Sequence, residues 1–150
     1  MKPIKKTVYS LIIAVGLVLL TAIANAATPP NVLVVGQIAE PKSLDPHAVT
    51  AVNDFRILMN VYDGLVRYKD GTLEVEPALA TAWEPIGDGQ GWRFTLRQCV
   101  TFHDGAAFSA DDVLFSYERA ASEQSDTRSW FSPVSGVTKV DDFTIDIMTN

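Results

Sequence analysis

Residues 91–121 constrain the fold more than any other stretch, because a strand, a tight turn and a capped helix follow one another there. Trp92, Phe94 and Leu96 alternate with polar residues, which predicts a strand with these three side chains on its inner face. Asp104-Gly105 is a dipeptide typical of tight turns, since glycine adopts a positive φ at little cost. The stretch therefore predicts mixed α and β structure.

The acidic residues that follow the turn fit the start of a helix. Ser109 stands three residues before Asp112, the spacing of a capping box at a helix N-terminus. Asp111 and Asp112 then fall in the first turn, where the helix dipole favours negative charge. The acidic pair thus has a structural explanation that needs no catalysis.

Histidine and cysteine could form a reactive centre, but their spacing does not favour one. The two histidines, His47 and His103, lie far apart with no HExxH pattern, and no GxSxG motif occurs. We therefore expect a structural role for His103. Cys99 is the single cysteine, so it closes no intramolecular disulfide, and its apolar, strand-like setting predicts a buried, inert thiol.

The N-terminus has the pattern of a secretory signal peptide. Three lysines among the first six residues precede an apolar run over residues 8–23, and Ala24 and Ala26 fit the cleavage rule before Ala27. The run is short for a membrane span, which needs about 20 residues. We expect cleavage after Ala26, with residues 1–26 as the signal peptide, and an uncleaved anchor is the alternative.

The charge balance bears on possible partners. The chain has 12 lysines and arginines against 18 acidic residues, and loss of the signal peptide would make it more acidic. Nucleic acids and anionic membranes call for a basic patch, so neither is expected as a partner. Net charge does not identify the ligand.

Four further segments yield element predictions. The apolar run 31–36 predicts a strand buried on both faces, and the proline-containing segment 37–47 predicts an extended loop. A helix is expected after an N-cap at Asn53 or Asp54 and should end at Gly64. Its predicted core face consists of Phe55, Leu58, Met59 and Tyr62. Pro77 should open a short helical turn over residues 78–82.

The last residues form another alternating pattern. Phe143, Ile145 and Ile147 share one face of a predicted strand, and the sequence stops with no terminal helix or cap. We expect this chain to be the N-terminal part of a longer protein, with residues 143–149 left as an unpaired sheet edge.

Six short motifs together resemble the family 5 extracellular solute-binding proteins, the dipeptide- and oligopeptide-binding receptors of ATP-binding-cassette importers. In order, the motifs are SLDP, YDGL, LATAWE, FTLR, FHDG and ADDVLFS. The resemblance covers about residues 31–149, and the order and spacing are specific although each motif alone is weak. Cys99 stands where the family usually has glycine, and Ala107 replaces a common proline.

The resemblance implies an α/β fold, a periplasmic-binding-protein-like clamshell of two lobes (type II, with an accessory subdomain), of which this chain is the N-terminal third. Residues 27–50 would begin the first ligand-binding lobe. Residues 51–150 would form most of the accessory subdomain.

The resemblance also implies ligand-binding residues. The loop matching IAEPKSLDP contributes Ala39, Glu40 and Pro41, with Glu40 as the charged group that could meet a ligand ammonium. The alternative for Glu40 is a solvated loop carboxylate. Arg128 and Trp130 are weaker candidates, and Trp130 could equally be a core residue.

The implied function is a periplasmic receptor that captures peptides or a related solute and delivers it to a membrane permease. Such a receptor needs no catalytic residue, metal or cofactor, and would be a monomer when full length. One alternative is a receptor of the same family for an opine, haem, a nickel chelate or an oligosaccharide. The other is a secreted hydrolase, which would need an activated serine beside His47 or His103.

Overall fold

All of the helices and strands described lie in one unit of the chain, Ile38–Asn150. The computed structural model describes residues 28–150. The predicted signal peptide, residues 1–26, lies outside these residues and stays a prediction.

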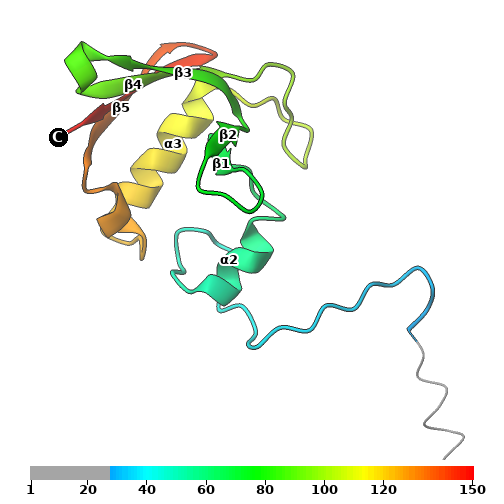
Figure 1. Ribbon diagram of the computed structural model, residues 1–150. Helices are drawn as coiled ribbons and strands as arrows, with labels where there is room; N and C mark the ends of the chain where they lie inside the picture. The colour runs from blue at the N-terminus through cyan, green and yellow to red at the C-terminus, as the bar shows by residue number, and fades with distance from the viewer. Residues whose placement is uncertain (1–27) are drawn as a thin grey trace, which may run out of the picture. The chain divides into compact units, whose positions relative to one another are not determined.

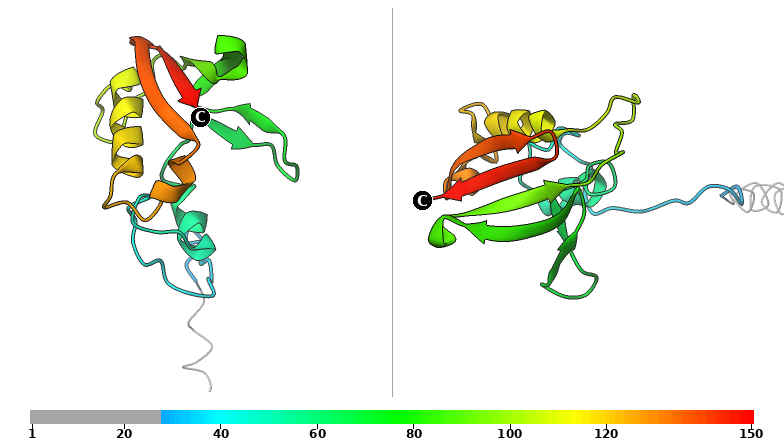
Figure 2. Two further views of the ribbon diagram at one scale, coloured as in Figure 1. Left: turned by 90° about the vertical axis from the view of Figure 1, so that its left-hand side faces the viewer. Right: turned by 90° about the horizontal axis from the view of Figure 1, so that it is seen from above.

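Two antiparallel hairpins join side by side into a four-stranded sheet in the order β3-β4-β6-β5 (Figure 2). The first hairpin is β3 (Ala80–Ile86) and β4 (Gly91–Leu96), linked by the 3-10 turn η1 (Gly87–Gly89). The second is β5 (Val134–Asp141) and β6 (Thr144–Thr149). Since β6 pairs with both β4 and β5, the prediction that its residues form an unpaired edge was wrong.

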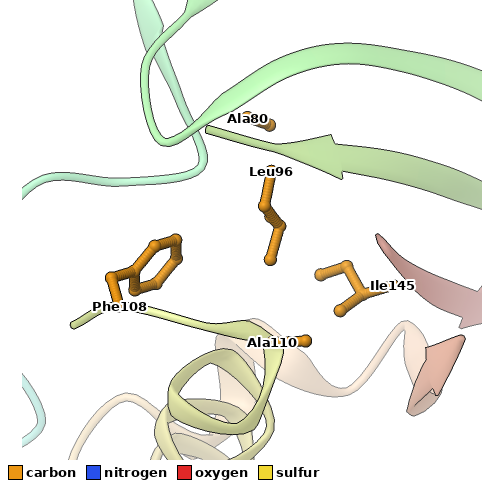
Figure 3. Packing of buried hydrophobic residues seen from close by; sticks show 5 residues of the cluster. All are labelled: Ala80, Leu96, Phe108, Ala110 and Ile145. Atoms are coloured by element: carbon orange, nitrogen blue, oxygen red, sulfur yellow. The ribbon is translucent and has the colours of Figure 1, made fainter. Parts of the chain in front are cut away.

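The helix α3 (Ala110–Ala121) lies against one face of this sheet (Figure 1). Figure 3 shows the core between them, which consists of Ala80, Leu96, Phe108, Ala110 and Ile145. The core gathers at the Leu96 end of β4, and Ile145 is fully buried, as the alternation of its strand predicts. Trp92, at the far end of β4, is 42% exposed, so its predicted inward position was wrong.

The turn and the helix start predicted from local motifs are confirmed. Gly105 has a φ of +89° and donates its N–H to the Phe102 carbonyl at 2.9 Å, while Thr101 and Ala107 form an antiparallel bridge. At the start of α3 a capping box is present, in which the Ser109 backbone N–H donates to Asp112 Oδ2 at 2.8 Å.

The helix α2 (Val52–Leu58) is shorter than expected. Its N-cap is Ala51, rather than Asn53 or Asp54. It ends early because the Asn60 side-chain amide donates to the Arg56 carbonyl at 2.7 Å, and the Asn60 N–H turns to the Ile57 carbonyl. A side chain that bonds the backbone in this way competes with continued helix.

The predicted core face of α2 is only partly correct. Leu58 is 2% exposed, whereas Met59 is 76% and Tyr62 is 50% exposed. Both exposed residues follow the last helical residue, so they no longer share the face that the helical spacing implied.

Two other predicted elements differ from the structure. Residues 31–36 form no strand, and Leu33 is 87% exposed. A strand needs a partner strand, and residues 31–36 belong to neither of the two sheets found within residues 28–150.

Residues 78–82 form no helical turn, because Ala80 begins β3 and pairs with Leu96. Pairing with β4 thus outweighs the helix propensity of the alanines. Before β3 the chain makes a small hairpin of β1 (Val66–Tyr68) and β2 (Val75–Pro77).

Cys99 is exposed, so the predicted burial of its thiol was wrong. Its φ is +60°, a left-handed conformation that favours glycine. The backbone therefore explains why glycine is the residue usual at this position in the family that the sequence resembles.

Replacing Cys99 by glycine should stabilise the protein. The left-handed conformation costs an L-residue about 1–2 kcal/mol, and the greater chain entropy of unfolded glycine offsets part of this gain. We expect Cys99→Gly to raise the free energy of unfolding by about 0.5–1 kcal/mol in urea denaturation. Cys99→Ala keeps the Cβ atom and is the matched control, which should stay near wild type. A glycine variant less stable than the alanine variant would contradict this account.

Candidate functional site

The loop that precedes α2 carries three of the predicted ligand-binding residues and is tied to that helix. We call residues 38–50 the Pro41 loop. The Lys42 backbone N–H donates to Asp54 Oδ1 at 2.7 Å, and the Asn53 side-chain amide donates to the Glu40 carbonyl at 3.2 Å. These two bonds fix the backbone on both sides of Pro41.

A second attachment joins the far end of the Pro41 loop to α3. Arg119 donates from Nη1 to Asp45 Oδ1 at 2.8 Å and from Nη2 to Asp45 Oδ2, so the pair is bidentate. Arg119 Nη1 also lies 2.9 Å from His47 Nδ1. The His47 carbonyl in turn accepts from the Asp126 N–H at 2.9 Å.

The electrostatics of this junction follow from Arg119. Its hydrogen bond, followed by that of the His47 N–H, lowers the pKa of the Asp45 carboxyl to about 2. Burial, and then the charge of Arg119, lower the pKa of His47. Because a guanidinium only donates, His47 Nδ1 accepts, and the neutral ring carries its proton on Nε2.

The structure places the remaining candidates in the 3-10 helix η2 (Arg128–Phe131). Arg128 is exposed, and Trp130 is 54% exposed. The Trp130 ring packs against Phe55 of α2 with 5.7 Å between ring centroids. Trp130 is therefore a surface aromatic residue with one supported face, which is a suitable form for a contact with a ligand.

Both groups of candidates contact α2. The first turn of α2 holds the Glu40 carbonyl, and Phe55 supports Trp130. Lys42 Nζ lies 3.4 Å from Asp126 Oδ2, shortly before η2. The Glu40 side chain itself is exposed.

Sequence reasoning missed the supporting residues Asn53, Asp54 and Arg119. The sequence predicts Asn53 and Asp54 only as possible N-caps, and no motif indicates a role for Arg119. Their partners lie 12 or more positions away, except for the adjacent Asn53–Asp54 contact. Spacing within one helix could not have revealed them.

A cavity of about 490 Å³ lies beside α3, with β5 and β6 among its walls. Its lining is mostly apolar and includes Phe108, Val113 and Val137. His47 and His103 both reach it, but no cluster of three or more potential metal ligands occurs within residues 28–150. His103 itself is exposed at the 102–107 turn.

The fold matches solved periplasmic binding proteins. DppA from Helicobacter pylori, in complex with the peptide STSA, is 32% identical with a TM-score of 0.63, over 75% of this chain and 26% of that one. MoaA from A. tumefaciens R10, in complex with mannopinic acid, is 32% identical with a TM-score of 0.66, over 71% of this chain and 23% of that one. The described part of the chain therefore has the mixed α/β fold of this class.

Residues 74–150 match the bacterial extracellular solute-binding proteins, family 5 Middle, and the chain belongs to this family. A curated relative is the probable D,D-dipeptide-binding periplasmic protein DdpA of Escherichia coli (strain K12), 38% identical over 101 residues. That match covers 65% of this chain and 20% of the relative, so the chain spans about a fifth of its length. Among residues 28–150, no helix is both long and apolar enough to cross a membrane.

The contact between His47 and Arg119 should make the stability of the protein depend on pH. The folded pKa of His47 is below the ordinary 6.5, so its stabilising contribution is complete above pH 6.5 and is lost as pH falls through the folded value. We expect the melting temperature to fall between pH 7 and pH 5. His47→Asn keeps a side-chain oxygen that can accept from Arg119 but does not titrate. In this variant the part of the fall in melting temperature that is due to His47 should disappear.

Calorimetry at three pH values would measure this effect. His103→Asn, at the exposed turn, is the matched control and should keep the wild-type pH dependence. The same pH dependence in His47→Asn as in wild type would show that His47 does not cause it.

Proposed function

We propose that this chain is part of a periplasmic receptor that captures a peptide or related solute and delivers it to an ATP-binding-cassette permease. The observation that carries the proposal is the family match over residues 74–150. The relative DdpA, described as a probable D,D-dipeptide-binding periplasmic protein, supports a peptide ligand and export. Export would use the predicted signal peptide.

The site is proposed from the geometry of the Pro41 loop and η2. Ala39, Glu40 and Pro41 would face the ligand, with the exposed Glu40 carboxylate meeting its ammonium group. Arg128 and Trp130 would contact the ligand from η2. In this proposal residues 27–50 begin the first lobe, and residues 51–150 belong to the accessory subdomain.

Binding by such a receptor involves no covalent change. Closure of two lobes excludes water and completes hydrogen bonds to the ligand, and trapped waters let varied side chains fit. An exposed ion pair contributes only about 0–1 kcal/mol, whereas micromolar affinity needs about 8 kcal/mol. Most of the affinity would therefore come from contacts elsewhere in the full-length protein.

The polarity of the His47 contacts favours a receptor over a hydrolase. In a Ser-His-Asp triad the histidine Nδ1–H donates to a carboxylate, which stabilises the charged imidazolium. Here His47 Nδ1 accepts from the Arg119 guanidinium, and that charge opposes protonation of the ring. His47 is thus poorly suited to act as a general base.

A second candidate function is a receptor for a non-peptide solute. MoaA, in complex with mannopinic acid, and DppA, in complex with the peptide STSA, are both 32% identical to this chain. Sequence identity thus supports both ligand classes equally. The proposal favours a peptide because of DdpA, and a binding experiment must separate the two.

Thermal shift with the full-length protein tests the ligand class. The probes are L-Ala-L-Ala, D-Ala-D-Ala, trialanine and mannopinic acid. A ligand that binds only the folded state stabilises it by about 2.7 kcal/mol at 100 times its Kd, so at least one peptide should raise the melting temperature. Mass spectrometry should recover that peptide intact.

The other outcomes are equally informative. A shift with mannopinic acid alone would support the second candidate, and cleavage of the peptides would support the hydrolase. No shift with any probe would contradict the proposal for these ligand classes.

Substitution of Glu40 tests its contact with the ligand ammonium. Glu40→Gln should weaken binding of the peptide probe by up to about fivefold, because an exposed ion pair contributes at most about 1 kcal/mol. The N-acetylated peptide lacks the ammonium, so wild type and Glu40→Gln should bind it equally in calorimetric titration. Glu74→Gln, on the β1–β2 hairpin, is the matched control. An equal loss for both peptides would contradict the assigned contact.

A further inference from the structure

Asp54 is a buried carboxylate whose position calls for an explanation. It is 1% exposed, and Thr127 is the other buried polar residue within 28–150. Burial of a carboxylate costs free energy unless hydrogen bonds compensate for the lost water. The partners of Asp54 should therefore reveal what its burial achieves.

The Asp54 carboxylate does not cap its own helix. The N-cap of α2 is Ala51, which makes no side-chain capping bond. Asp54 Oδ1 instead accepts from the Lys42 backbone N–H at 2.7 Å and from the Asn53 side-chain amide at 3.3 Å. The carboxylate is thus directed at the Pro41 loop rather than at its own helix N-terminus.

The Asn53 side-chain amide links Asp54 to the Pro41 loop. The same amide nitrogen lies 3.2 Å from the Glu40 carbonyl, so it bridges that carbonyl and the Asp54 carboxylate. Pro41 lies between the two attachment points, and its ring fixes φ and removes one backbone donor. The backbone from Glu40 to Lys42 is therefore held in one conformation.

We propose that Asp54 is a positioning residue, which sets the conformation of the Pro41 loop so that Glu40 and its neighbours are ready to meet the ligand. This inference rests on the proposed function, because it assigns a role in the same site. If the loop were free to sample other conformations, the apparent affinity would fall by the fraction of molecules in the competent one. Asp54 does not itself touch the ligand.

The attachment at Arg119 cannot replace this role. Arg119 holds Asp45 and His47, which lie at the far end of the loop. The Lys42 side chain reaches Asp126 through an exposed pair at 3.4 Å, a kind of contact that restrains the backbone little.

Calorimetric titration of the full-length protein with L-Ala-L-Ala, D-Ala-D-Ala and trialanine tests the proposal. Asp54→Ala should weaken binding of the peptide that binds wild type by about tenfold. Asp54→Asn keeps an acceptor at Oδ1 for the Lys42 N–H and should stay within about threefold of wild type. Leu96→Val, in the sheet core, lowers stability without touching the loop and should leave affinity unchanged.

Hydrogen exchange supplies a readout of loop position that general destabilisation does not reproduce. In Asp54→Ala the Lys42 amide should exchange faster than in wild type, whereas Leu96→Val should speed exchange in β4 and β6 and leave the Lys42 amide at its wild-type rate. If Asp54→Ala folds poorly, Asn53→Ala provides a second variant, because it removes the amide bonds to the Glu40 carbonyl and to Asp54 Oδ1 but keeps the bond between the Lys42 N–H and Asp54. It should weaken binding by about threefold.

The outcomes separate this inference from the proposed function. Peptide binding by wild type and by Asp54→Ala with equal affinity would overturn the positioning role alone. An equal loss in Asp54→Asn and Asp54→Ala would also overturn it, since the asparagine keeps the acceptor. Failure of wild type to bind any of the three peptides would overturn the proposed peptide receptor, and the positioning role with it.

Discussion

The pairing of β6 with β4 joins the two hairpins into one sheet, and the position of α3 depends on that sheet. Phe94 lies opposite Ile145 in this pair, and Arg93 makes two hydrogen bonds of 2.8 Å to Asp146. The Ala110 N–H, at the start of α3, donates to the carbonyl of Asp142 between β5 and β6 at 2.9 Å. The sheet therefore sets where the helix begins, and the core between them sets its direction.

The position of α3 in turn determines the far end of the Pro41 loop. Arg119 lies in the last turn of α3, where it binds Asp45 and His47. The near end of the same loop depends on α2, through Asp54. The Pro41 loop is thus held at two points. The Glu40 carboxylate, near the start of the loop, is exposed to solvent.

Local patterns predicted local structure well. The capping box of Ser109, the turn at Gly105 and the alternation around Ile145 depend on neighbours within a few residues, and all three are confirmed. The errors concern partner strands elsewhere in the chain and backbone conformations that hydrophobic patterns do not reveal. The strand expected at 31–36 needed partners elsewhere, and Cys99 needed a backbone conformation that its apolar setting does not reveal.

The family motifs describe the scaffold of the site rather than its chemistry. Asp45 of SLDP binds Arg119, Gly105 of FHDG forms a turn, and Asp112 of ADDVLFS completes a capping box. The fold that these contacts support is shared with DppA, in complex with a peptide, and with MoaA, in complex with mannopinic acid. Matching motifs therefore establish the family but leave the ligand open. In the proposed site, exposed residues outside these motifs, such as Glu40 and Trp130, would contact the ligand together with residues elsewhere in the full-length protein.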